Sequence, residues 1–281
     1  MPYTAEISRT NPSCFLFLID QSGSMAETFG AQPDKKKAHE VATAINRLLQ
    51  TLVLRCAKGP EVLDRFHIGV VGYGHTSVGS AFGGTLKAQT LVPISRLAAH
   101  PLRVEPRTKK VDDGTGGVVE QQIKFPVWFD PVANGQTPMC RALDLAWNAL
   151  NDFVGQYPGC FPPIVINITD GKATDGDPEP HARCIRDLAS RDGNVLLFNV
   201  HLSSRRDRPV ELPDDEERLP DDFARLLFRM SSLLPPAMRE TAWREGYLVA
   251  DQTRGFVFNA DLVSVIRFLD IGTRVDTRHL R

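Results

Sequence analysis

The chain has 281 residues, with 33 basic and 34 acidic side chains and a formal net charge of −1 at pH 7. Hydrophobic residues make up 42% and charged residues 24%, values typical of a soluble globular protein with one sizeable domain or two small ones. Because the charge is balanced, no overall positive field favours nucleic acid or an anionic membrane as a partner.

Targeting signals and cysteines point to the cytoplasm. No stretch approaches the roughly 20 apolar residues of a membrane-spanning helix, and the polar N-terminus does not resemble a signal peptide. The five cysteines are never spaced CxxC and stand at Cys14, Cys56, Cys140, Cys160 and Cys184. This pattern favours buried, reduced thiols over a disulfide framework or a zinc site.

The first predicted elements are two strands around a helix. The apolar run Cys14–Ile19 predicts a strand covered on both faces, since such strands are continuously apolar. A helix is predicted over about 35–56, where apolar residues form one stripe at helical spacing. Its first residues, Lys35 to Lys37, are expected to be solvated. A second strand is predicted over 66–73.

The later elements continue the alternation of strand and helix. Two β-prone runs around DDGTGG predict a hairpin within 103–130. The remaining predictions are a helix at 138–157, a strand at 163–169, a helix at 180–191, a strand at 195–202, a charged loop at 203–222, a helix at 223–234, a strand at 256–259 and a helix at 260–269.

This alternation predicts an α/β fold, namely a Rossmann-like, doubly wound, mostly parallel sheet flanked by helices. Asp20 and Asp170 each follow directly after a buried strand. In such sheets ligands bind outside the carboxyl ends of the strands, where the strand order reverses. The two aspartates therefore indicate one site at that edge.

The stretch FLIDQSGSM, residues 17–25, allows a nucleophile, a phosphate cradle or a metal site. The G-x-S-x-G elbow of serine hydrolases is absent, because Ser22 stands between Gln21 and Gly23. An aspartyl phosphatase would normally place a second carboxylate two residues after Asp20, where this chain has Ser22. No glycine-rich phosphate-binding motif follows the strand.

A metal site fits these residues better. Side chains at alternate positions, Asp20, Ser22 and Ser24, project to one side as the chain leaves the sheet. One carboxylate and two hydroxyls are hard oxygen donors, which favour Mg²⁺, Mn²⁺ or Ca²⁺ over zinc. Asp170 can approach the same point from the end of its own strand.

The D-x-S-x-S pattern of Asp20, Ser22 and Ser24 resembles the metal-ion-dependent adhesion site (MIDAS) of von Willebrand factor type A (vWA) domains. That family adds a threonine in a loop before a later helix and an aspartate in a TDG sequence after the central strand. This chain has Thr137 in GQTPM and Asp170 in TDG, in the same order. The resemblance covers roughly residues 14–269.

The resemblance implies a single vWA-like domain over 1–281, with a core at about 14–270, a hairpin insertion at about 103–130 and a charged loop at about 203–222. It implies that Asp20, Ser22, Ser24, Thr137 and Asp170 bind a divalent cation, Mg²⁺ or alternatively Mn²⁺ or Ca²⁺. In this family the cation binds an Asp or Glu of a protein partner.

The expected function is therefore that of a metal-dependent adaptor or scaffold and not of an enzyme. By analogy with the family, the partner would belong to an ATPase, kinase or phosphatase system. Two alternatives stay open. One is a metal-dependent hydrolase that uses Asp20, Asp170 and His75, and the other is a cation with a purely structural role.

Two further expectations concern the surroundings of the site. The hairpin should shape partner specificity, with Phe125, Trp128 and Phe129 either exposed as anchors or packed as an extension of the core. Asp175 and Asp177 should shape the turn after Asp170 and cap the helix that follows it.

Overall fold

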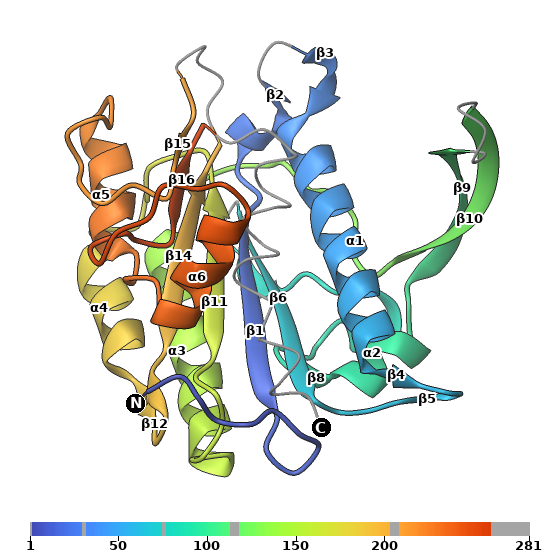
Figure 1. The fold of residues 1–281 in the computed structure, drawn as a ribbon. Helices are drawn as coiled ribbons and strands as arrows, with labels where there is room; N and C mark the ends of the chain where they lie inside the picture. The colour runs from blue at the N-terminus through green and yellow to red at the C-terminus, as the bar shows by residue number, and fades with distance from the viewer. Residues whose placement is uncertain (1, 30–31, 75–76, 113–117, 203–207, 260–281) are drawn as a thin grey trace.

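The computed structural model describes residues 2–29, 32–74, 77–112, 118–202 and 208–259. Within these ranges, a mixed, mostly parallel sheet of eight strands lies between two layers of helices (Figure 1). The predicted α/β architecture is confirmed. The helix predicted over 260–269 lies outside the described residues.

The central sheet has its longest strands in the middle. Its order is β15 (Val210–Glu211), β16 (Phe256–Phe258), β14 (Leu196–His201), β11 (Ile164–Thr169), β1 (Ser13–Asp20), β6 (Phe66–Gly74) and β7 (Ser77–Ser80), with β8 (Val92–Pro93) also paired to β6. The strands from β16 to β6 are parallel, and β15, β7 and β8 pair antiparallel at the margins.

The strand order reverses between β1 and β11. From β1 the chain continues to β6 on one side, whereas β11 is followed by β14 and β16 on the other. The crevice beyond the carboxyl ends of these two strands is the favoured ligand position in sheets of this kind. Asp20 is the last residue of β1 and Asp170 directly follows β11.

Helices cover both faces of the sheet, which explains why β1 is apolar throughout. Phe15, Phe17 and Ile19 belong to one buried cluster, and Leu16 and Leu18 to the other. The first cluster includes residues of α1 (Lys37–Cys56), α2 (Ile94–Ala99) and α6 (Pro236–Arg244). The second includes residues of α3 (Met139–Gln156), α4 (Glu179–Asp187) and α5 (Asp222–Met230).

Short elements complete the fold. They are the pairs β2 (Thr28–Phe29) with β3 (Gln32–Lys36), β4 (Ala57–Lys58) with β5 (Glu61–Val62), and β12 (Ala189–Ser190) with β13 (Gly193–Asn194), together with the 3₁₀ turns η1 (Gly23–Ala26) and η2 (Gly84–Leu86). None of the described helices is both long enough and apolar enough to cross a membrane.

A neutral polar network crosses the interior of the sheet. The Tyr73 hydroxyl donates to Asn167 Oδ1 at 2.7 Å, and Asn167 Nδ2 donates to Asn199 Oδ1 at 2.9 Å. Asn199 Nδ2 donates to Ser231 Oγ at 2.9 Å, and Ser231 Oγ donates to the carbonyl of Leu227 at 2.8 Å. Polar groups of β6, β11 and β14 are thereby paired inside an apolar core.

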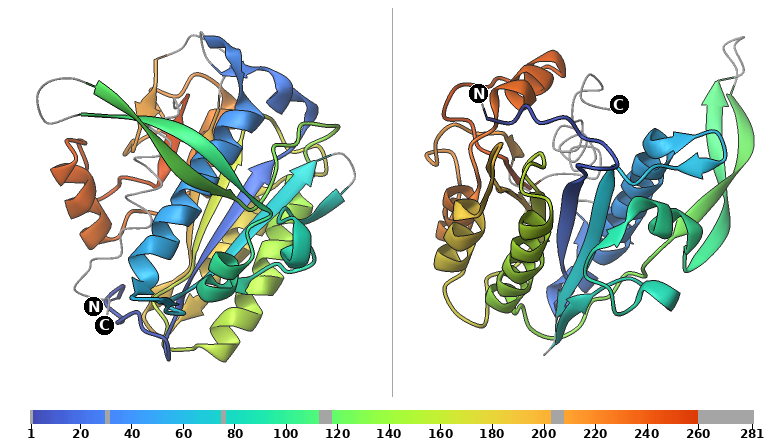
Figure 2. Two further views of the ribbon diagram at one scale, coloured as in Figure 1. Left: turned by 90° about the vertical axis from the view of Figure 1, so that its right-hand side faces the viewer. Right: turned by 90° about the horizontal axis from the view of Figure 1, so that it is seen from below.

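The predicted hairpin is formed by β9 (Arg103–Asp112) and β10 (Val118–Val127), which pair antiparallel and separately from the central sheet. Figures 1 and 2 show it as a long curved arm outside α1. Most of the DDGTGG sequence lies outside the described residues. An isolated pair of strands is marginally stable in water, so contacts at its base have to hold the arm.

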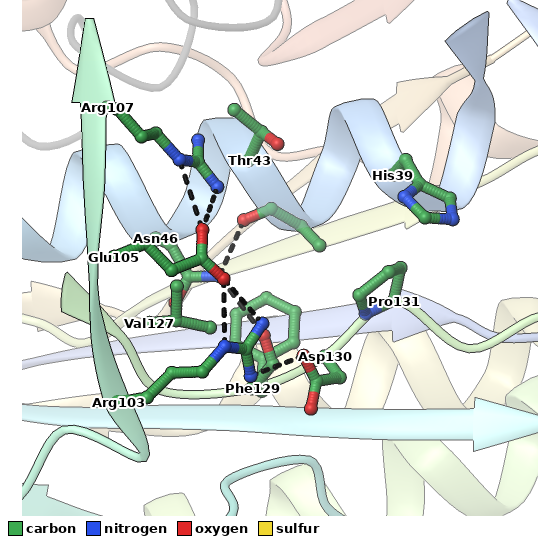
Figure 3. A pocket seen from close by; sticks show the side chains of 11 residues that line it. His39, Thr43, Asn46, Arg103, Glu105, Arg107, Val127, Phe129, Asp130 and Pro131 are labelled. Atoms are coloured by element: carbon green, nitrogen blue, oxygen red, sulfur yellow. Dashed lines mark hydrogen bonds and ion pairs between the residues drawn. The ribbon is translucent and has the colours of Figure 1, made fainter. Parts of the chain in front are cut away.

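Charged side chains pair with one another along that base (Figure 3), and Asn46 of α1 joins the base to the helix. The Glu105 carboxylate accepts from Arg103 at 2.8 Å and from Arg107 at 2.9 Å. Arg103 also pairs with Asp130 at 2.7 Å, where the chain leaves β10. On α1, Asn46 Oδ1 accepts from the backbone N–H of Trp128 at 2.8 Å.

The aromatic residues around the hairpin are buried. Phe125, Trp128 and Phe129 are each 2% exposed, and the Trp128 indole N–H donates to the carbonyl of Leu97 at 2.7 Å. The guanidinium of Arg107 lies 3.6 Å from the centre of the Phe125 ring. The expectation of exposed aromatic anchors is wrong, because these side chains extend the core.

Candidate metal centre

The Asp20 carboxylate is held at the end of β1 by neutral donors. Its side chain is fully buried. Oδ1 accepts from the backbone N–H of Ser22 at 2.8 Å, which closes the turn after the strand. Oδ2 accepts from the hydroxyl of Thr169 at 2.7 Å, so the last residue of β11 fixes the carboxylate of β1.

Two serine hydroxyls connect this turn to the second aspartate. Ser22 Oγ lies 3.1 Å from Ser24 Oγ. Ser24 Oγ in turn donates to Asp170 Oδ1 at 2.7 Å. The Asp170 side chain is also fully buried. Four of the predicted ligands therefore come together at the junction of β1 and β11.

Backbone hydrogen bonds position the loop that carries Thr137. The N–H of Gly23 donates to the carbonyl of Gly135 at 3.0 Å, which joins this loop to the turn after β1. The Thr137 N–H donates to Thr174 Oγ1 at 3.1 Å, and the Thr174 N–H donates to the Thr137 carbonyl at 3.0 Å. Thr137 is 5% exposed, at the start of α3.

A glycine leaves space between the hydroxyls. A Cβ atom placed on Gly171 would lie 3.6 Å from Thr137 Oγ1 and 3.8 Å from Ser24 Oγ. Both oxygens therefore lie beside the same small volume, next to Asp170. This placement brings the fifth predicted ligand, Thr137, to the same side of Gly171 as Ser24.

Asp175 and Asp177 cap two different helices. Asp175 accepts from the backbone N–H groups of Cys140 at 3.1 Å and Arg141 at 3.0 Å, at the start of α3. Asp177 Oδ1 accepts from the N–H of Glu179 at 3.0 Å, at the start of α4. The expectation that both cap the following helix is right for Asp177 and wrong for Asp175, because the turn folds back over α3.

Lys37 places a cation inside the cluster. Its side chain is 2% exposed, and Nζ lies 2.7 Å from Asp170 Oδ2. The carboxylate of Glu27, which is 59% exposed, lies 3.3 Å from the same nitrogen. The expectation of a solvated charge run is therefore wrong for Lys37, although Lys36 is exposed.

The position of Lys37 has a sequence signal. It stands four residues before Val41 and eight before Ile45, both of which are buried on α1. Residues at i, i+4 and i+8 share one face of a helix, so the apolar stripe continues back onto Lys37. A lysine on the core-facing stripe at the end that meets the strand edge should have been predicted as a buried ion-pair partner.

The cluster retains negative charge. Burial raises the pKa of the Asp20 carboxyl to about 6, against the opposing effect of hydrogen bonds from Thr169 and Ser22. The nearby charge of Asp170 adds to this rise. Two buried carboxylates face one buried ammonium, so at neutral pH one negative charge is left without a buried partner in the cluster.

The donor set fits a hard cation. Two carboxylates and three hydroxyls supply only oxygen, the donor that Mg²⁺, Mn²⁺ and Ca²⁺ prefer. In the described ranges, no group of three or more His, Cys, Asp or Glu side chains is arranged to hold a metal ion. A cation here would therefore depend on the hydroxyls of Ser22, Ser24 and Thr137.

Among the described residues, His201 is the histidine at this edge, and it does not have the properties of a catalytic base. His75, the base of the hydrolase alternative, lies outside the described residues. His201, at the end of β14, is 6% exposed and stacks on Phe258 with ring centres 4.9 Å apart. Burial lowers the pKa of His201 to about 4, so its imidazole is neutral at pH 7. Its Nδ1 atom is buried without a hydrogen-bond partner.

The same edge of the sheet thus carries five oxygen-bearing side chains from three separate segments of the chain: Asp20, Ser22, Ser24, Thr137 and Asp170. Compared with known proteins, the chain matches no family model and no curated protein.

Proposed function

We propose that this chain is a vWA-like domain that binds a divalent cation at this edge and, through it, the carboxylate of a protein partner. The observation that supports the proposal is the convergence of two carboxylates and three hydroxyls beyond β1 and β11. They also occur in the order of the vWA motif. A proposal from the motif alone would lack this spatial support.

The five residues would bind the cation through two kinds of oxygen donor. Ser22, Ser24 and Thr137 would offer neutral oxygens, whereas Asp20 and Asp170 would offer charge. When bound, Mg²⁺, or alternatively Mn²⁺ or Ca²⁺, would provide a coordination position for an Asp or Glu of the partner. Because Lys37 pairs with Asp170 and the other three donors are neutral, the charge of the cation would be compensated only in part, which favours a further carboxylate.

We place the protein in the cytoplasm as an adaptor or scaffold and not as an enzyme. All five cysteines are free and four of them are buried, which suits a reducing compartment. The proposed partner is a component of an ATPase, kinase or phosphatase system, on family analogy alone. The hydrolase alternative requires turnover that His75→Ala abolishes, whereas an adaptor shows none.

The hairpin arm of β9 and β10 is proposed as an insertion that shapes partner specificity. Its aromatic residues are buried, so its polar side chains would make the contacts. Deletion of residues 107–120, with a short turn in their place, should weaken partner capture. Unchanged capture by a folded deletion variant would refute this role.

Affinity capture from a cell extract tests the main proposal. Wild type and Asp20→Ala are each used with Mg²⁺ or with a chelator, and Asp177→Ala serves as a matched control. Asp177 is an exposed aspartate near the same edge that caps α4 and lies outside the donor set. A partner should be retained by wild type and the control with Mg²⁺ and lost in every other sample.

Two outcomes would contradict the proposal. Partners retained in all samples would show that binding does not need the cation. A large loss of melting temperature with chelator, but no partner that depends on Mg²⁺, would show that the cation only holds the loops together.

A further inference from the structure

The cluster at the end of β1 and β11 contains a cation of its own. Lys37 Nζ lies 2.7 Å from Asp170 Oδ2, while Asp170 Oδ1 accepts from Ser24. The two oxygens of this carboxylate therefore have different partners, an ammonium group on one and a hydroxyl on the other. Asp20, in contrast, accepts only from neutral donors, Ser22 and Thr169.

The position of the ammonium group is fixed by the fold. Lys37 is the first residue of α1, and its backbone N–H donates to the carbonyl of Glu27 at 3.0 Å. Its side chain is 2% exposed. Because the stem is enclosed and the backbone is anchored, the ammonium group is a built-in part of the site and not a surface charge that moves between solvent and Asp170.

We propose that Lys37 is an internal counter-ion that neutralises Asp170 and keeps the affinity of the free protein for divalent cations low. Tight cation binding would then require the carboxylate of the partner. This inference rests on the proposed function and names how that site is regulated.

The physical argument is charge balance. Asp20 and Asp170 without Lys37 would match the two positive charges of a divalent cation and leave little attraction for a third carboxylate. With Lys37 paired to Asp170, only the carboxylate of Asp20, which accepts from neutral donors, remains to face the cation. A repulsive charge within a few ångströms in a buried site weakens binding far more than an exposed charge does.

Cooperativity follows from this balance. A partner carboxylate would supply the negative charge that Lys37 removes, so the partner should raise the affinity for the cation. By thermodynamic linkage the cation must then raise the affinity for the partner by the same factor. Lys37 would thus convert two weak binding events into one joint event.

The rival explanation is that Lys37 only ties the start of α1 to the loop after β11. A tie of this kind contributes to stability, and its removal would not tighten cation binding. The two explanations therefore predict different cation affinities for a Lys37 variant, tighter binding for a counter-ion and no tightening for a tie, and both predict a loss of stability.

The test is a titration of the full chain with Mn²⁺, followed by electron paramagnetic resonance of the free ion and without any partner. Lys37→Met keeps the length of the apolar stem and removes the charge. It should lower the Mn²⁺ dissociation constant by about tenfold or more, as expected for removal of a close buried charge.

Two single variants serve as controls. Lys36→Met removes an exposed positive charge from the neighbouring residue, and Glu27→Gln removes the exposed carboxylate beside Lys37. Both should leave the Mn²⁺ dissociation constant within about twofold of wild type, because water and salt screen exposed charges.

Lys37→Met leaves Asp170 without its ion pair and could unfold in the absence of metal. In that case, refolding by Mn²⁺ at or below the wild-type dissociation constant supports the inference, and failure to refold in saturating Mn²⁺ overturns it. A folded Lys37→Met with unchanged or weaker Mn²⁺ affinity also overturns it.

The outcomes separate this inference from the proposed function. If wild type and Lys37→Met bind Mn²⁺ equally, only the role of Lys37 fails. If Lys37→Met binds and wild type without a partner does not, the counter-ion role stands, and the metal-dependent adaptor is decided by the Mg²⁺-dependent capture of a partner. If neither binds, both fail.

Discussion

Two buried polar clusters lie within the same sheet and differ in charge. The interior network joins Tyr73, Asn167, Asn199 and Ser231 through neutral hydrogen bonds and ends on a backbone carbonyl. Each of these side chains has at least one partner inside the protein. This network can therefore be explained as satisfaction of polar groups in an apolar core.

In the cluster at the strand ends the buried charges do not balance. Two buried carboxylates, Asp20 and Asp170, face the single buried ammonium of Lys37. A buried charge without a partner costs free energy, and a raised Asp20 pKa is the result of that cost. The two clusters are alike in burial and hydrogen bonding and differ in charge balance, so the uncompensated charge is what distinguishes the proposed site from the interior network.

The largest expected effect is on cation binding by the charged cluster. Asp20→Ala removes a proposed ligand and the charge that Lys37 leaves unbalanced, so Mn²⁺ affinity should fall by about a hundredfold or more. Isothermal titration calorimetry measures it. Asn167→Ala, in the neutral network, is the matched control and should bind as wild type does. If Asp20→Ala binds Mn²⁺ with an affinity within threefold of wild type, the charged cluster does not differ from the neutral network in cation binding.

The neutral network should instead determine stability. Asn167→Leu leaves the Tyr73 hydroxyl and the Asn199 side chain without a shared partner, so the free energy of unfolding should fall by about 3 kcal/mol. Urea denaturation followed by circular dichroism gives this value. A loss below about 1 kcal/mol would indicate that the network relaxes and that its hydrogen bonds carry little net free energy.

His201 tests whether the edge tolerates a second buried positive charge. Its folded-state pKa of about 4 lies below the ordinary value of 6.5, so its contribution to stability is present above pH 6.5 and is lost as pH falls toward 4. Between pH 7 and 5 this residue should cost about 2 kcal/mol. Asp221 and Asp170 oppose the shift and Lys37 adds to it.

Urea denaturation at several pH values measures the contribution of His201. His201→Gln should flatten the decline in stability between pH 7 and 5 relative to wild type. An equal decline in the two proteins would assign the acid sensitivity to other groups.

The smallest expected effects come from two serine variants, one in each cluster, which should change different properties of the protein. Ser24→Ala removes a proposed ligand, and Ser231→Ala removes a hydroxyl from the neutral network. Ser24→Ala should weaken Mn²⁺ binding about tenfold. Ser231→Ala should leave that binding unchanged and lower the free energy of unfolding by about 1 to 2 kcal/mol. Equal effects of both variants on Mn²⁺ affinity would show that the two clusters are coupled.

The sequence predicts the central fold well because its long elements have strong periodicity. The strand over Cys14–Ile19 and the helices near 35–56 and 138–157 agree with β1, α1 and α3 to within a few residues. Helix α6 and the margin strands β7, β8 and β15 carried too few periodic residues to be predicted. They form because longer neighbours offer a surface on which to pair or pack.

The predicted ligands could be brought to one edge from the sequence alone, since strand ends and the order of the motif locate them. Side-chain contacts between segments that are distant in sequence could not be predicted in this way. The burial of Lys37 follows from its place on the apolar stripe of α1, but its pairing with Asp170 and the capping of α3 by Asp175 require knowledge of which loops meet. The aromatic residues beside the hairpin illustrate the same limit, because hydrophobic sequence does not distinguish an anchor from a core residue.

The hydrogen bonds between the Thr137 loop and its neighbours restrict the conformations of this loop and so reduce its conformational entropy in the folded protein. The contacts of Gly23 with Gly135 and of Thr137 with Thr174 order this loop when the chain folds. The conformational entropy of the loop is therefore lost during folding, and a cation at the proposed site would meet donors that are already ordered. Amide hydrogens of Gly23 and Thr174 should consequently exchange with solvent slowly even without any ligand, as expected of backbone held in the native structure.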